Sequence, residues 1–160
     1  MICWLDGTFV EGSDPRISAL DAGFQHGVGL FETMQARGGK VFRLSDHLER
    51  LAESARELGL ADPLRVEPLA QAVEQVMQRW GEAPARIRLT ISAGVVNMLR
   101  EARDGRPVRT DPTLLIVATP PTAFPQPMFD QGVGVVVADD RLNPLDRFGG
   151  HKTLWYWPRL

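Results

Sequence analysis

Lys152 is the residue whose type and neighbours point most directly to chemistry. It follows the pair Gly149-Gly150 and precedes the aromatic run 155–157. The chain has 16 arginines but only two lysines, Lys40 and Lys152. A lysine amine that aromatic neighbours shield from water can be neutral and form a Schiff base with a carbonyl compound, which a guanidinium cannot do. The residues alone also fit a solvated surface lysine, the commoner case, and this alternative stays open.

Arg50 is a second candidate, because a forked guanidinium can bind a phosphate through two parallel hydrogen bonds. It could instead pair with Asp46 or Glu53 at helical spacing. Gly27 and Gly29 could let the backbone approach a ligand closely, although two glycines are more often part of a turn. No metal site is predicted, because none of the three histidines shows the spacing of metal ligands: His26, His47 and His151.

Short β-strands are expected to position these side chains. The pair Asp6-Gly7 between the β-prone runs 2–5 and 8–10 predicts a hairpin. A second hairpin is expected over 30–36 and 40–43, with Gly38-Gly39 as its turn. The remaining predicted segments are strands at 87–92, 114–118 and 133–138, a glycine-rich loop at 23–29 and a polar loop at 97–112.

Two amphipathic helices follow from the spacing of apolar residues. Ser45 is the expected N-cap of the first helix, and Gly59 is its expected stop. The second helix is expected to begin near Pro68 and to end at Gly81. Their apolar faces are formed by Leu48, Leu51, Ala55 and Leu58 in the first helix and by Leu69, Val73, Val76, Met77 and Trp80 in the second.

The composition is typical of a globular α+β protein. Of the 160 residues, 44% are hydrophobic and 24% are charged, and the formal net charge is −2. This balance excludes a disordered tail or a coiled coil and indicates no nucleic-acid partner. The single cysteine, Cys3, excludes an intramolecular disulfide. With no apolar stretch of about 20 residues and no signal-like start, we expect a cytoplasmic protein with no membrane partner.

The distribution of prolines predicts a domain boundary. Prolines at positions 120, 121, 125 and 127 indicate a stiff, extended connector. We expect an N-terminal α+β domain over 1–119, a proline-rich linker over 120–127 and the start of an incomplete second domain over 128–160. The three aromatic residues at 155–157 would otherwise leave apolar surface uncovered. Alternatively, this tail packs back on the first domain or on a partner subunit.

Four segments, taken together, show the pattern of one enzyme family. They are Asp21-x-Gly23 with 26–33, then 42–51 with Ser54-Ala55, then 86–94, and finally 151–154 with Tyr156. In this order they resemble the N-terminal signature, the first helix, the following strand and the lysine motif of the class IV aminotransferases, the fold-type IV pyridoxal phosphate enzymes. The resemblance spans the chain, and its specificity comes from the order and separations of the segments.

The resemblance implies roles for individual residues. Lys152 matches the lysine that binds pyridoxal 5'-phosphate covalently and then moves protons. Arg50 matches the arginine that contacts the cofactor phosphate, and Tyr156 is similar to a cofactor-binding tyrosine of some branches. Phe31 and Glu32 fall where the family lines the substrate side. The implied architecture is the D-amino-acid aminotransferase-like fold, with a cofactor-binding second domain, in a homodimer that acts on a small amino-carboxylate substrate.

The resemblance also suggests which member of the family this is. The run Phe31-Glu32-Thr33 resembles aminodeoxychorismate lyases, which eliminate pyruvate to give aminobenzoate in folate biosynthesis. Branched-chain or D-amino-acid transaminases remain an alternative, as does a truncated, non-catalytic homologue that acts as an interaction module. Family members run to nearly twice this length, and the glutamate that pairs with the pyridine nitrogen lies in the additional part. We therefore expect these 160 residues alone to bind cofactor weakly and to catalyse little.

Overall fold

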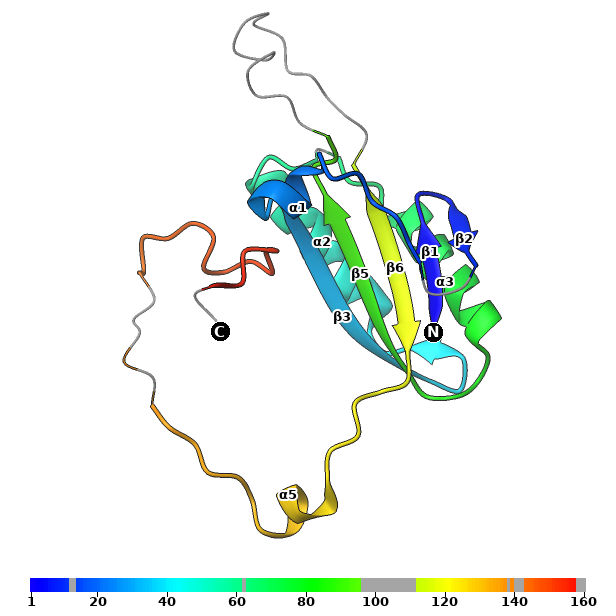
Figure 1. The fold of residues 1–160 in the computed structure, drawn as a ribbon, viewed down its shortest axis with the longest axis vertical. Helices are drawn as coiled ribbons and strands as arrows, with labels where there is room; N and C mark the ends of the chain where they lie inside the picture. The colour runs from blue at the N-terminus through cyan, green and yellow to red at the C-terminus, as the bar shows by residue number, and fades with distance from the viewer. Residues whose placement is uncertain (12–13, 62, 96–111, 138, 140–142, 158–160) are drawn as a thin grey trace, which may run out of the picture.

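A six-stranded antiparallel sheet organises the chain (Figure 1). The computed structural model describes residues 1–11, 14–61, 63–95, 112–137, 139 and 143–157. The sheet has the strand order β2-β1-β6-β5-β3-β4. The strands are β1 (Ile2–Leu5), β2 (Thr8–Val10), β3 (Gly29–Arg37), β4 (Lys40–Val41), β5 (Ala85–Ser92) and β6 (Leu114–Thr119).

Two long helices, α2 (Leu44–Glu57) and α3 (Val66–Trp80), pack on one face of this sheet (Figure 1). Two short helices are α1 (Ala22–His26), which precedes β3, and α5 (Gln126–Asp130), which lies in the connection beyond β6. Alternate residues of the central strands point toward α2 and α3, as the pleat requires. The most deeply buried of the core side chains are Leu48, Ala55, Val73, Val76, Ile87, Leu89, Ile116 and Ala118.

The structure confirms the α+β class and both predicted hairpins. Asp6 and Gly7 have positive φ between β1 and β2, and Gly38 and Gly39 have positive φ between β3 and β4. The strands predicted at 87–92 and 114–118 are confirmed as β5 and β6. The second helix ends before Gly81, as predicted, but it begins two residues before Pro68. Most of the loop predicted at 97–112 lies outside the described residues.

Three local predictions are wrong. Ser45 lies inside α2, whose N-cap is Arg43 in the left-handed conformation; the Arg43 side chain pairs with Asp46 instead of a serine capping the first turn. The glycine-rich stretch contains α1, because the Asp21 side chain accepts a hydrogen bond from Gly23 N and caps that helix. The strand predicted at 133–138 does not form over its described residues 133–137, which are exposed, since none of the described strands pairs with them.

The domain boundaries remain a prediction. Strand β6 ends at Thr119, where the proline-rich connection begins, and α5 begins inside the expected linker and continues past its predicted end at residue 127. The connection runs away from the sheet and the chain then returns toward β3 (Figure 1).

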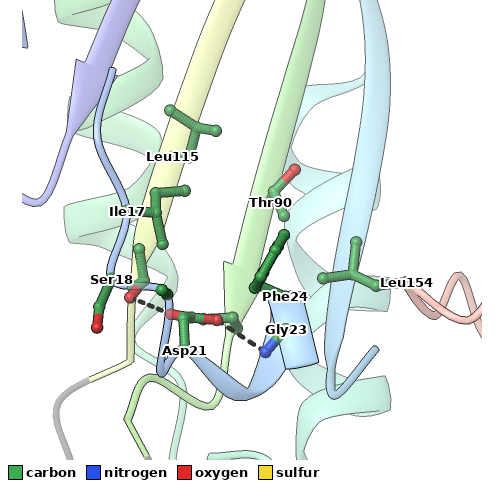
Figure 2. Close-up of a pocket in the computed structure, with 11 residues that line it drawn as sticks. Ile17, Ser18, Asp21, Gly23, Phe24, Thr90, Leu115 and Leu154 are labelled. Carbon is green, nitrogen blue, oxygen red and sulfur yellow. Dashed lines mark hydrogen bonds between the residues drawn. The ribbon is translucent and has the colours of Figure 1, made fainter. Parts of the chain in front are cut away.

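Asp21 joins α1 to the strands that follow it in the sheet. Its carboxylate is 2% exposed and accepts hydrogen bonds from Gly23 N, Ser92 Oγ and Thr113 Oγ1, each at 2.7 Å. Burial alone would raise the pKa of Asp21, but these hydrogen bonds outweigh burial and hold it below its ordinary value. Figure 2 shows Asp21 beside the apolar pocket that Ile17 and Leu115 help to line.

Replacing Asp21 with asparagine should lower the free energy of unfolding at pH 7 by about 2 kcal/mol, because a charged acceptor of three hydrogen bonds is lost. The folded-state pKa is depressed, so the stabilisation is complete above about pH 5 and is lost as the pH falls through the folded pKa. The difference from wild type should therefore shrink in acid. Urea unfolding at pH 7 and at about pH 2 measures this, with exposed Asp14→Asn as control. Equal unfolding midpoints at pH 7 would contradict the prediction.

Candidate active site

The segment that carries Lys152 extends the sheet at the edge of β3. Phe31 N donates a hydrogen bond to Lys152 O at 2.9 Å, and Leu154 N donates one to Gly29 O at 3.0 Å. Thr153, 8% exposed, pairs with Leu30 between these bonds. A Cβ on Gly29 would lie 2.6 Å from both Leu154 Cδ1 and Ile91 O, so the close approach requires glycine here. Backbone pairing therefore fixes Lys152 beside β3.

Helix α2 holds the same segment from a second side. His151 Nδ1 lies 2.9 Å from Ser54 Oγ, and His151 Nε2 lies 3.4 Å from Glu57 Oε2. Arg147 Nη2 donates to the backbone oxygen of Glu57 at 2.8 Å. These contacts, with the β3 pairing, place Lys152 between the strand edge and the helix.

Phe31 is the centre of a cluster on the sheet face opposite α2 and α3. Its ring is 4% exposed and lies 5.5 Å from Lys152 Nζ, 3.8 Å from Arg88 Cζ and 5.8 Å from the Tyr156 ring centroid. Arg88 is half-buried on β5, and no carboxylate pairs with it among the described residues. Burial, together with the charge of Arg86, lowers the pKa of Arg88, although the guanidinium remains charged at any ordinary pH. An anion bound beside Arg88 would therefore be stabilised.

Glu32, the next residue of β3, points to the opposite face and meets α2. Its carboxylate accepts from Arg50 Nε at 2.7 Å and from Arg50 Nη2 at 2.6 Å. His47 Nδ1 lies 2.8 Å from Glu32 Oε2 and 3.1 Å from Arg50 Nη2. Burial would raise the pKa of Glu32, but the bonds from Arg50 and His47 lower it overall, and the same pairing raises the pKa of Arg50.

Four of the five site residues predicted from the sequence, all except Tyr156, meet at one cavity of about 200 Å³. It is lined by Leu30, Phe31, Glu32, Arg50, Leu51, Ser54, Gly150 and Lys152. An amine and a guanidinium at one cavity could bind, respectively, a carbonyl carbon and a phosphate. Tyr156 does not line this cavity and reaches the site through Phe31. The individual roles that the resemblance implies for these residues stay predictions.

Sequence reasoning gave no site role to Arg88 or His47. Alternation of apolar and charged residues along β5 places Arg86 and Arg88 on the face away from the helices, but which ring Arg88 meets depends on the register with β3. His47 lies one helical turn before Arg50, so the i, i+3 spacing could have indicated their contact.

The fold and the site define a class of protein: an α+β domain that presents a lysine amine and an arginine at one edge of its sheet. The chain belongs to the amino-transferase class IV family, whose model matches residues 29–160. No helix among the described residues is long and apolar enough to cross a membrane.

Relatives of known sequence include both transaminases and lyases. A putative branched-chain-amino-acid aminotransferase of Methanocaldococcus jannaschii is 31% identical, covering 91% of this chain and 48% of the relative. A bifunctional aminodeoxychorismate lyase / D-amino acid transaminase of Mycobacterium tuberculosis is 30% identical, covering 97% of this chain and 50% of the relative. The chain therefore spans about half the length of these relatives.

Solved structures agree with this fold. The 4-amino-4-deoxychorismate lyase of Pseudomonas aeruginosa is 28% identical and superimposes with a TM-score of 0.76, covering 98% of this chain and 53% of that one. A branched-chain amino acid aminotransferase of Escherichia coli is 22% identical, with a TM-score of 0.79, covering 95% of this chain and 51% of that one. At this identity the second comparison supports the fold alone.

Proposed function

We propose that the protein containing this chain is a pyridoxal phosphate-dependent enzyme in which Lys152 binds the cofactor covalently. The observation that carries the proposal is that Lys152 and Arg50 line one cavity. The donors present fit the cofactor, since an amine suits its aldehyde carbon and a guanidinium suits its phosphate. A hypothetical aminotransferase of Mycobacterium tuberculosis, 27% identical with a TM-score of 0.62, has a PLP-bound form and supports this choice.

The chain's own residues suit an amino-carboxylate substrate. When bound, pyridoxal phosphate supplies an electron sink for negative charge at the substrate α carbon. Lys152 Nζ would take the proton from that carbon and later return one. Arg88, with which no carboxylate pairs among the described residues, would bind the substrate carboxylate through its guanidinium. Phe31 and Tyr156 would form the wall that orients the substrate. Arg50 would hold the phosphate.

The finer proposal is an aminodeoxychorismate lyase, which eliminates pyruvate from 4-amino-4-deoxychorismate to leave 4-aminobenzoate. The Phe31-Glu32-Thr33 run and the match along nearly the whole chain to the Pseudomonas aeruginosa lyase support it. The bifunctional Mycobacterium tuberculosis relative favours a second candidate, an amino-acid transaminase, because lyase and transaminase activity occur together in that protein. Both reactions start with removal of the same α proton, so the residues named above serve either one.

Product analysis separates these candidates. The complete protein, supplied with pyridoxal phosphate, is incubated with aminodeoxychorismate or with amino acids, each with and without a 2-oxo acid. We expect pyruvate and aminobenzoate without any 2-oxo acid. Product that forms only when a 2-oxo acid is present would establish a transaminase and reject the lyase. No product under any condition would favour a non-catalytic interaction module, and a Lys152→Ala variant should then retain the biological role.

A further inference from the structure

Glu32 is a buried carboxylate without a role in proton transfer to the substrate. It is 1% exposed, and Asp21 is the only other buried acidic side chain among the described residues. Asp21 stabilises α1 and the neighbouring strands, whereas Glu32 meets the proposed phosphate-binding arginine. A carboxylate removed from water is costly unless it is paired, and both oxygens of Glu32 are paired by Arg50 and His47. Because an unpaired Glu32 carboxylate would be costly to bury, the arrangement in which Arg50 and His47 pair with it is favoured over others.

The pairing leaves one side of Arg50 available. A guanidinium carries five N–H donors in a fixed fork. Nε and Nη2 donate to the two Glu32 oxygens, so that edge of the fork is occupied. No acceptor bonds Arg50 Nη1 among the described residues, and half of the side chain is exposed while it lines the cavity with Lys152. The orientation of the occupied edge thus sets the direction in which the remaining donors point.

We propose that Glu32 is a positioning residue that, together with His47, orients Arg50 to bind the cofactor phosphate. This inference rests on the proposed function, and it assigns Glu32 to the phosphate end of the cofactor instead of the substrate side that the resemblance implies. His47 Nδ1 contacts both Glu32 and Arg50, so its ring supports the pair from the same helix. Without this support Arg50, which is half exposed, would sample many rotamers.

The negative charge of Glu32 allows the proposal to be tested by whether phosphate affinity rises or falls when that charge is removed. A carboxylate close to a phosphate repels it, so if Glu32 acted only through its charge, its neutralisation would strengthen phosphate binding. If Glu32 acts by fixing the guanidinium, neutralisation weakens phosphate binding, because the bidentate pair is lost and the ordering of Arg50 must occur on binding. The two mechanisms predict opposite changes in the same measurement.

The measurement is the preference for pyridoxamine phosphate over pyridoxamine in the complete protein. It is expressed as the dissociation constant of pyridoxamine divided by that of pyridoxamine phosphate. Tryptophan fluorescence or calorimetry gives both constants without requiring catalysis. We expect Glu32→Gln to reduce this ratio about tenfold, His47→Gln to reduce it two- to threefold, and Arg50→Met to abolish most of it. In the Arg50→Met variant, adding Glu32→Gln should not reduce the phosphate preference further, because Glu32 acts on the phosphate only through Arg50. Exposed Glu49→Gln on the same helix is the matched control.

Each outcome has a defined reading. An increased or unchanged ratio in Glu32→Gln, when the wild-type ratio depends on Arg50, overturns the positioning role and leaves the proposed function intact. A wild-type protein with no phosphate preference overturns the phosphate site itself and this inference with it. If Glu32→Gln does not fold, Glu32→Asp and His47→Gln carry the test. Glu32→Asp keeps the charge but shortens the side chain, so a reduced ratio in that variant supports positioning.

Discussion

Replacing Lys152 with alanine should lower activity by about a thousandfold or more and remove covalent cofactor attachment. The amine is the group proposed to bind the aldehyde carbon and to carry the α proton, and a positioned proton-transfer group alone accounts for about 10²–10⁴-fold in rate. The β3 pairing that positions residue 152 uses backbone atoms, so the variant should retain the fold. Activity assays on the loaded protein, with circular dichroism as a folding check, measure the expected loss.

The second lysine of the chain, Lys40, provides a control for this experiment. The only other lysine, Lys40, lies on β4 and is exposed, so Lys40→Ala should change neither activity nor attachment. Borohydride reduction of the loaded protein followed by peptide mass mapping should place the pyridoxyl group on Lys152 alone. A pyridoxyl group on Lys40, or full activity in Lys152→Ala, would reject the assignment of Lys152.

The two hairpin turns and the apolar helix faces were predicted correctly from local signals, although the Ser45 cap and the loop at 23–29 were not. The pairs Asp6-Gly7 and Gly38-Gly39 need no distant partner to form turns, and the apolar face of α2 follows from the 3.6-residue period. The apolar run at 133–137 shows the limit of this reasoning. Its residues are β-prone, but a strand forms only beside another strand, and sequence periodicity does not identify a neighbour.

In the candidate site, too, residues in local motifs could be predicted, but contacts between distant segments could not. Lys152 and Arg50 could be chosen by residue type and resemblance, because both belong to motifs of fixed local spacing. Glu32 and Phe31 are adjacent in sequence but face opposite sides of β3, so their partners differ completely. Arg88 joins the Phe31 cluster through pairing of β3 with β5, although the two residues are 57 positions apart in the sequence. Such contacts depend on register, and a shift of one residue would move Arg88 to the other face.

Replacing Arg88 with leucine should raise KM for the amino-carboxylate substrate about 10- to 100-fold. A hydrogen-bonded carboxylate–guanidinium contact contributes about 1.5–3 kcal/mol, and each 1.4 kcal/mol is a factor of ten in affinity. The turnover number should fall less than KM rises, provided that the carboxylate contact is similar in the ground and transition states. Arg88→Lys, which keeps the charge but not the fork, should lie between leucine and wild type. Steady-state kinetics with the natural substrate measures all three proteins.

Two controls distinguish a substrate contact from a structural one. Arg86 lies on the same strand and face but does not contact the Phe31 ring, so Arg86→Leu should leave KM nearly unchanged. Cofactor attachment at Lys152 should persist in Arg88→Leu, because Arg88 meets Phe31 on the sheet face opposite the Glu32–Arg50 pair. If both leucine variants raise KM equally, the effect is general electrostatic attraction of the substrate. If Arg88→Leu instead prevents cofactor attachment, Arg88 supports Phe31 and the lysine segment, and the carboxylate must be bound elsewhere.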